Sequence, residues 1–361
     1  MNKRLLSSLD YGLIVPAIVL VILSLTTLFS INIALFKNQL IFFIISILAL
    51  IFFSQVDYKI IKKYCGLIYI VSIILLILVL AIGIESRGSV RWFEIIGFRI
   101  QFSEILKPFL AISFSAFLAN REDHSYKTFF LTICFLAPIA FLILIQPDLG
   151  NGLIYTLVTV LTLFIYGFPL PLFLLSFILV SIIAPFLWQF MYQYQKERII
   201  TFFHPTDPLG FSYNAIQSII TIGSGMIVGK GLGQGTQSGL QFLPERHTDF
   251  IFATLSEGLG FIGGVIVLLS FSFLLYRIII IFSNAQESFF KLFAIIVFSL
   301  ILLQFFINIG MNIGVIPVVG VTLPFLSYGG SSLLSNFIIL GILSAISQDS
   351  TKRKVQSYLI E

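Results

Sequence analysis

The sequence is poor in charge, since charged residues make up only 10% of its 361 positions while hydrophobic residues make up 58%. An ordinary soluble domain carries about 25% charged residues, so this composition excludes one. A membrane-spanning helix needs roughly 20 mostly apolar residues, which leaves room for on the order of ten such helices. We therefore expect an all-α polytopic membrane protein, built as a single transmembrane domain over residues 1–361.

Cysteine and histidine are also scarce. The two cysteines, Cys65 and Cys134, lie in or beside apolar runs and cannot make a disulfide framework. The three histidines, His124, His204 and His247, are far apart and show no metal-ligand spacing. The net charge of +5 comes from small basic clusters between apolar blocks, a pattern that indicates orientation in a membrane rather than binding of nucleic acid.

Ten apolar blocks are separated by charged residues or by proline and glycine. They fall at about 11–31, 39–55, 65–84, 101–119, 129–145, 150–167, 168–190, 249–282, 292–313 and 324–346. Tight turns are expected at 146–150 and 169–171, where proline interrupts the apolar runs. The first block follows Lys3 and Arg4 but is longer than the apolar core of a signal peptide, so we interpret it as a retained first helix.

The distribution of basic residues predicts the orientation. With ten spans and a cytoplasmic N-terminus, 12 of the 21 lysines and arginines fall on the cytoplasmic side, as the positive-inside tendency requires. Both termini are then cytoplasmic, and the long connection 191–248 is extracytoplasmic, between helices 7 and 8. Within it, 211–227 reads as a partly apolar amphipathic segment that we expect to lie along the membrane surface.

The densest polar cluster is the run PERHTDFIF at 244–252, where this connection returns to the membrane. Asp249 stands directly before an apolar helix, in a partly dehydrated place where a carboxylate can become more basic. It is a candidate general base. The alternative is that Thr248 or Asp249 simply caps the helix N-terminus.

The run GKGLGQG at 229–235 lacks the Gly-Lys-Ser/Thr ending of a nucleotide-binding P-loop. It remains a candidate flexible loop beside a diphosphate. Glu104 and Lys107 are three residues apart inside an apolar block, so they are either an ion pair that permits insertion or a pair that lines a polar cavity. Further polar residues enter apolar blocks at 146–148, at Glu257 and at 324–332.

Several of these strings together resemble the RodA/FtsW family of shape, elongation, division and sporulation (SEDS) proteins. They are PERHTDFIF at 244–252, Arg91-Trp92, QFSEILK at 101–107, QPDLG at 146–150 and LPFLSYGGSS at 323–332. The resemblance extends over nearly the whole chain. The Glu245-Arg246-His247 sequence and the short N-terminal tail are more similar to the RodA (elongation) branch than to the FtsW (division) branch.

The resemblance implies a peptidoglycan glycosyltransferase that polymerises lipid II into glycan strands at the outer face of the cytoplasmic (inner) membrane during elongation. It also implies ten transmembrane helices, a class B penicillin-binding protein as transpeptidase partner, and other membrane proteins of the elongation complex. Asp249 occupies the position of the family's essential acidic residue.

Such a reaction needs a base for the attacking hydroxyl and cations for the departing diphosphate. Asp249 is the candidate base, or a ligand of a divalent cation such as Mg²⁺ or Mn²⁺. Charge and predicted side make Arg246, Lys230, Arg91 and Lys196 candidate diphosphate ligands. Glu104 and Lys107 are expected in the cavity wall beside Asp249.

Two other functions fit the sequence. A lipid II flippase would use Glu104, Lys107 and Glu257 to line a polar path through the membrane. A membrane scaffold would only hold the penicillin-binding protein. A transporter should place its polar residues near the bilayer midplane, whereas here they gather at the long connection and its helix junctions, which favours an enzyme.

Overall fold

The computed structural model describes residues 9–86, 89–95, 98–121, 123–204 and 212–358. Lys3 and Arg4, which entered the sequence argument, lie outside these residues. The main helices are α2 (Tyr11–Ile31), α3 (Ile33–Phe53), α5 (Cys65–Ile82), α7 (Lys107–Ala119), α8 (Tyr126–Ile145), α9 (Leu149–Tyr166), α10 (Leu170–Phe190), α14 (Ile251–Asn284), α15 (Ser288–Asn312) and α16 (Gly330–Tyr358).

Eight helices of the described chain are long and apolar enough to cross a membrane. Two further predicted spans correspond to shorter apolar helices, Lys107–Ala119 and Leu170–Phe186. The block at 101–119 is shortened because its first residues form a separate short helix, α6 (Phe102–Ile105). The prediction of an all-α polytopic membrane protein is confirmed, and the count of ten spans stays a prediction.

The sequence did not reveal a small antiparallel sheet between α5 and α6. Strands β1 (Ile84–Ser86), β2 (Ser89–Ile95) and β3 (Phe98–Ile100) follow one another in that order. Strands this short give too few residues for an alternating pattern. The sheet ends directly before Gln101 and so fixes where α6 begins.

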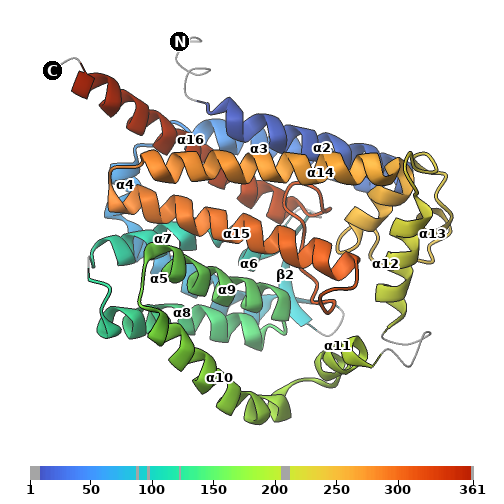
Figure 1. Cartoon of the computed structure of the whole chain (residues 1–361), viewed down its shortest axis with the longest axis horizontal. Coiled ribbons are helices and arrows are strands. Elements are labelled where there is room, and N and C mark those ends of the chain that lie inside the picture. Colours follow the sequence, from blue (N-terminus) through green and yellow to red (C-terminus); the bar gives the residue numbers. More distant parts are fainter. Residues whose placement is uncertain (1–8, 87–88, 96–97, 122, 205–211, 359–361) are drawn as a thin grey trace.

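The long helices form a layered bundle (Figure 1). Helices α2, α3, α14 and α16 lie together, α15 packs against α14, α7 and α9, and α16 also contacts α7. Large side chains such as Phe271, Phe293 and Phe337 are fully buried between these layers. Both expected tight turns are present, because α8 ends at Ile145 before α9, and α9 ends at Gly167 in the left-handed conformation before α10.

The described part of the long connection 191–248 contains three helices of its own: α11 (Gln193–Phe203), α12 (Tyr213–Ser224) and α13 (Thr236–Gly239). Helix α12 covers the described part of the predicted amphipathic segment, and residue 211 lies outside the described residues. Figure 1 shows α12 and α13 at one end of the bundle, while α10 leads away from its body towards α11. Which side of the membrane holds this connection stays a prediction.

Candidate active site

Asp249 is half-buried at the junction between the long connection and α14. Its backbone carbonyl accepts hydrogen bonds from Asn308 Nδ2 at 3.1 Å and Asn312 Nδ2 at 2.9 Å, both on α15. The N-cap position of α14 is Phe250, which makes no side-chain cap hydrogen bond. Neither Thr248 nor Asp249 occupies the cap position, so the structure removes that explanation for an acid here.

The space beside the Asp249 carboxylate is kept open by a glycine. Gly320 has a left-handed φ of +73°, and a Cβ at this position would lie 3.5 Å from Asp249 Oδ2 and 3.9 Å from Arg198 Nη1. A carboxylate and a guanidinium therefore border the same point. Arg198, on α11, escaped the sequence analysis because 51 positions separate it from Asp249 and no pattern links the two.

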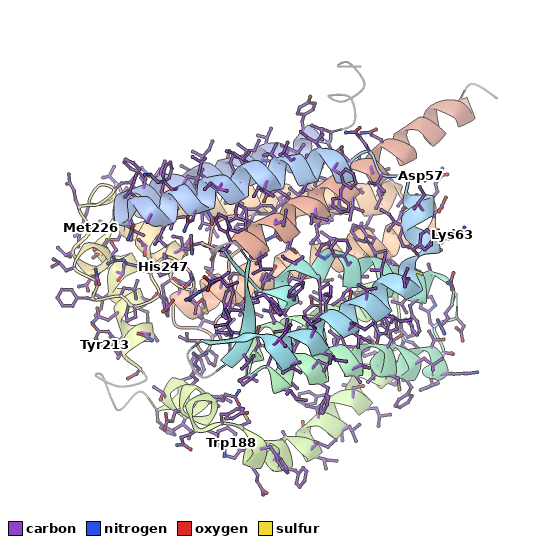
Figure 2. All side chains as sticks on the ribbon, turned by 180° about the vertical axis from the view of Figure 1, so that it is seen from behind. Asp57, Lys63, Trp188, Tyr213, Met226 and His247 are labelled. Atoms are coloured by element: carbon purple, nitrogen blue, oxygen red, sulfur yellow. The ribbon has the colours of Figure 1, made fainter. Side chains whose placement is uncertain are left out.

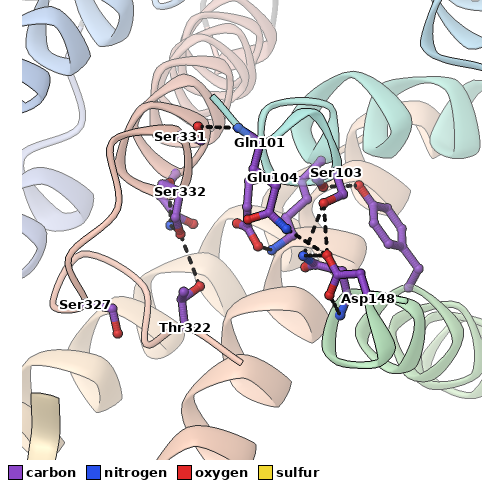
Figure 3. Close-up of polar contacts among 12 residues, drawn as sticks. Gln101, Ser103, Glu104, Asp148, Thr322, Ser327, Ser331 and Ser332 are labelled. Carbon is purple, nitrogen blue, oxygen red and sulfur yellow. Dashed lines mark hydrogen bonds and ion pairs between the residues drawn. The ribbon is translucent and has the colours of Figure 1, made fainter. Parts of the chain in front are cut away.

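A second polar cluster surrounds Asp148, the N-cap residue of α9 (Figure 3). Its Oδ2 accepts hydrogen bonds from Gln101 Nε2 at 2.7 Å, Ser103 Oγ at 3.3 Å and Asn151 Nδ2 at 3.0 Å. Arg91 Nη1 lies 3.8 Å from Asp148 Oδ1, and its side chain is 29% exposed. Asp148 is thus a buried, fully bonded carboxylate with an accessible cation beside it.

Glu104 and Lys107 form an ion pair of 2.7 Å next to this cluster, and both side chains are buried. This confirms the pairing expected from their spacing. Tyr155 donates its hydroxyl hydrogen to the carbonyl of Ser103 at 2.9 Å and, with Lys107, lines a cavity of about 40 Å³. The other residues that line this cavity are mostly apolar, among them Phe114, Phe135 and Ile139.

Residues 319–321 connect the surroundings of Asp249 with those of Asp148. A Cβ on Gly150, two residues after Asp148, would lie 2.8 Å from the Gly320 carbonyl oxygen and 2.9 Å from that of Val319. From the other side, Asn308 Nδ2 donates to the Val321 carbonyl at 2.7 Å. Asp249 and Arg198 on one side and the Asp148 cluster on the other therefore border the same backbone segment, residues 319–321.

Lys230 and Arg246, two candidate diphosphate ligands, belong to a different network. Buried Glu257 accepts hydrogen bonds from Ser238 Oγ at 2.6 Å and from the backbone N–H of Gln237 and Ser238 at 3.0 and 2.9 Å. Lys230 Nζ lies 3.4 Å from Glu257 Oε1. The network joins the glycine-rich run to α14.

Arg246 donates to the Ser238 carbonyl. Burial lowers the pKa of the Arg246 guanidinium, yet an arginine stays protonated at neutral pH. The remaining candidate, Lys196, lies on α11 two residues before Arg198. The four predicted cations thus lie on α11 (Lys196), in the sheet (Arg91), in the glycine-rich run (Lys230) and in the residues that precede α14 (Arg246), and the roles assigned to them and to Asp249 stay predictions.

Fold and site together define a polytopic helical membrane protein in which Asp249 and Arg198 border one glycine where the long connection meets the helices. A family model for the FtsW/RodA/SpoVE cell cycle proteins matches residues 2–352. The chain belongs to this SEDS family.

Two relatives align with most of this chain. The chain is 39% identical over 308 residues to the peptidoglycan glycosyltransferase MrdB of Escherichia coli strain K12, covering 84% of this chain and 82% of MrdB. It is 38% identical over 327 residues to the stage V sporulation protein E of Bacillus subtilis strain 168, covering 87% of each.

Solved structures share the fold. One chain of a peptidoglycan synthase complex that coordinates polymerization and crosslinking superimposes with a TM-score of 0.83 and 28% identity, covering 95% of this chain and 98% of that one. A mutant of the rod shape determining protein RodA of Thermus thermophilus gives a TM-score of 0.72 with 25% identity, covering 94% and 98%. The resemblance to the RodA branch is consistent with both results.

Proposed function

We propose that this peptidoglycan glycosyltransferase polymerises lipid II into glycan strands during cell elongation, with Asp249 as its catalytic base. The 4-hydroxyl of an incoming GlcNAc attacks the anomeric carbon of MurNAc in the growing strand. A bond forms between that oxygen and the anomeric carbon, and the bond from this carbon to the undecaprenyl diphosphate breaks. The hydroxyl proton passes to the Asp249 carboxylate.

The observation that carries this proposal is the position of the half-buried Asp249 carboxylate beside Gly320 and Arg198, with the α14 cap position already filled by Phe250. Asn308 and Asn312 fix the backbone of Asp249, so the side chain projects from a rigid support. A positioned base is typically worth about 10²–10⁴-fold in rate.

Arg198 and Arg91 are the cations best placed for the departing diphosphate. Arg198 borders the same gap as Asp249, and Arg91 is partly exposed beside the cluster that adjoins residues 319–321. A guanidinium can bind two phosphate oxygens at once. Lys230 instead ties the glycine-rich run to Glu257, and Arg246 bonds the Ser238 carbonyl on α13.

A divalent cation such as Mg²⁺ or Mn²⁺ fits this site only if the substrate supplies part of its coordination. Among the described residues no group of three histidine, cysteine, aspartate or glutamate side chains could hold a metal ion. Asp249 would therefore supply one oxygen, and substrate phosphates and water the rest, as is usual for Mg²⁺. The ion would neutralise charge on the departing diphosphate.

The proposed setting follows from the family and from the basic clusters of the sequence. We propose that the protein lies in the cytoplasmic membrane with both termini in the cytoplasm, and that the reaction occurs on the outer face. A class B penicillin-binding protein would crosslink the strands it makes. The similarity to a chain of a peptidoglycan synthase complex supports such a partner.

The test is polymerisation of purified lipid II by the wild type and by Asp249→Asn, each with and without the partner transpeptidase and a divalent cation. We expect glycan strands from the wild type and a loss of about 10²-fold or more in the variant. Asp57→Asn is the matched control, because Figure 2 places Asp57 at the end of the bundle away from His247.

Full activity in a folded Asp249→Asn variant would refute both the base and the metal-ligand role. Absence of strands under every condition, together with lipid II movement across proteoliposomes, would instead support the flippase. An enzyme is favoured because Glu104, Lys107 and Glu257, the residues that a flippase would use, are buried and paired within the protein.

A further inference from the structure

An exposed apolar tip lies within the long connection. Met226, Ile227 and Val228 are 81%, 69% and 75% exposed, although they follow directly after α12. Beside them on α14 stand Phe261 and Ile262, which are 68% and 49% exposed. We call Met226, Ile227 and Val228 the apolar tip. Figure 2 shows Met226 at the outer edge of the molecule.

Backbone hydrogen bonds hold the apolar tip against α14. The N–H groups of Phe261 and Ile262 donate to the carbonyls of Met226 and Ile227 at 2.8 and 3.2 Å. These bonds are possible because α14 is interrupted at Gly260, whose φ of 67° and ψ of −162° are not helical. The tip therefore accepts hydrogen bonds from backbone N–H groups of α14 that, in a continuous helix, would bond to carbonyls of the preceding turn.

The break also fixes the residues that follow the tip. Lys230 N–H donates to the Glu257 carbonyl at 2.9 Å and Gly231 N–H to that of Gly258 at 3.0 Å. A backbone N–H or C=O group that makes such a hydrogen bond can lie away from water without a cost in free energy. A segment at membrane depth must meet this condition.

The level of the tip follows from the pairing of α2 with α14. These helices pack together in opposite directions, and Arg277 of α14 binds Asp10 at the start of α2 through an ion pair of 2.8 Å. Phe261 precedes Arg277 by 16 positions, which places it opposite Thr26. Helix α2 continues to Ile31, so at 1.5 Å per residue the tip lies about 8 Å inside its end.

The chemistry of the segment agrees with this level. Residues 211–229 contain no charged side chain, and the first charge is Lys230, immediately after the tip. Gly233 comes close to Ser30, near the end of α2, so the chain has returned to that level within five residues of the tip. Lys230 directs its amino group to Glu257 and Thr236, so its charge is paired within the protein where the chain leaves the apolar tip.

We infer that the apolar tip inserts among the lipid acyl chains of the leaflet at the C-terminal end of α2 and anchors the glycine-rich run to the membrane. Apolar groups of interfacial segments reach about 5–10 Å below the head groups, which agrees with the level given by the helix pairing. Lipid is the occupant because the tip is continuous with Phe261 and Ile262, which face outward from a membrane-spanning helix. The inference depends on the membrane fold and not on the proposed reaction.

The test measures the depth of a nitroxide at the tip in the full chain, reconstituted in nanodiscs of phosphatidylethanolamine and phosphatidylglycerol. Cys65 and Cys134 are first replaced by alanine, and one label is attached through Ile227→Cys. Phe261→Cys serves as the lipid reference and Gln234→Cys, exposed on the same run, as the aqueous reference.

Collision rates with oxygen and with a water-soluble nickel chelate are then compared by power saturation. We expect the oxygen-to-nickel ratio at Ile227→Cys to match Phe261→Cys and to exceed Gln234→Cys severalfold. A ratio equal to that of Gln234→Cys would place the tip in water and overturn the inference. Low collision rates with both reagents would show that protein covers the tip, which also overturns it.

A second measurement requires no substitution, in case the labelled variants do not fold. A phospholipid with a diazirine in its acyl chain is activated in the nanodisc, and modified peptides are mapped by mass spectrometry. We expect modification within 226–228 as well as at 261–262. Modification at 261–262 alone would contradict insertion of the tip.

Discussion

At the scale of single residues, the site depends on amide side chains as much as on charged ones. Asn308 and Asn312 are fully buried one turn apart on α15, and each donates a hydrogen bond to the Asp249 carbonyl. Asn312 Oδ1 also accepts from the Ala253 N–H at 3.2 Å. A buried donor costs about 1–3 kcal/mol when it is left unsatisfied, so these amides and the backbone they bind specify one another.

Arg198 and Lys196 provide a matched pair for testing the cation beside Asp249. They are two positions apart on α11, about 200° around a helix, so their side chains leave it in different directions. We expect Arg198→Ala to lower the polymerisation rate about tenfold or more, and Lys196→Ala to leave it within about threefold of wild type, because only Arg198 borders the Asp249 gap.

The measurement is the initial rate of strand formation from lipid II at several substrate concentrations, with Arg198→Lys as a third variant. Partial recovery with lysine would indicate a role for charge, while two-oxygen binding needs the guanidinium. Equal rates for the Arg198→Ala and Lys196→Ala variants would reject a role for Arg198 at the site.

At the scale of elements, α14 is the helix on which the site is built. Its first ten residues are covered by the long connection, and its outward-facing apolar side chains begin at Phe261, after the break at Gly260. Lys230 of the glycine-rich run pairs with Glu257, three residues before the break, and Asp249 stands just before the helix begins. One interrupted helix thus holds both the run and the acid.

Substituting Gly260 should destabilise this arrangement. A Cβ there would lie 2.3 Å from the Gly229 nitrogen and 2.5 Å from the Ile227 oxygen, and the backbone conformation itself is one that other residues adopt at a cost of about 1–3 kcal/mol. We expect Gly260→Ala to lower the thermal unfolding temperature and to increase cleavage of the connection in limited proteolysis.

Gly66→Ala is the control for this experiment. Gly66 lies in α5 with nothing within 4 Å of an added Cβ, and alanine in a helix is favoured over glycine by about 0.5–1 kcal/mol. Its unfolding temperature should equal or exceed that of wild type. A Gly260→Ala variant as stable and protease-resistant as Gly66→Ala would show that the break is not required.

At the scale of the whole molecule, a polar cluster far from the site joins three helices. Asp10 caps α2, binds Arg277 of α14 through Nε at 3.0 Å and Nη2 at 2.8 Å, and accepts a hydrogen bond from Ser347 of α16 at 2.6 Å. The Asp10 N–H donates to Ser344 at 3.3 Å. The cluster sets the register of α2 against α14 on which the level of the apolar tip depends.

This cluster predicts a pH dependence of stability. Burial alone would raise the pKa of Asp10, but hydrogen bonds from Arg277 and Ser347 and the charge of Arg277 outweigh it, and the folded pKa lies below the ordinary 3.8. A carboxyl whose pKa is lower in the folded state stabilises the fold above its unfolded pKa and loses this contribution as the pH falls through the folded value.

We therefore expect Asp10→Asn to unfold at a lower temperature than wild type at neutral pH, and the difference to shrink below pH 3.8. Thermal unfolding in detergent at both pH values measures it, with Asp57→Asn as the control. A difference that stays constant with pH would show that the Asp10 charge does not stabilise the fold.

The sequence determined the class of protein and the order of its helices, because apolar runs and the residues that interrupt them are local properties. It also pointed to Asp249, Glu104 and Lys107 by their position in or beside apolar blocks, and to the turn at 146–150 by its proline. The three short strands between 84 and 100 gave no such signal, since their pairing is formed between segments too short to show a period.

Only the tertiary structure decided which charged residues meet. Lys230 has the same charge as Arg198 in the sequence, yet it lies beside Glu257 while Arg198 borders the gap at Asp249. In the sequence, Gly260 is one more glycine in an apolar run. The helix break at Gly260 provides contacts for a loop more than 30 positions away. Contacts of this kind arise when distant segments pack together, so no local pattern records them.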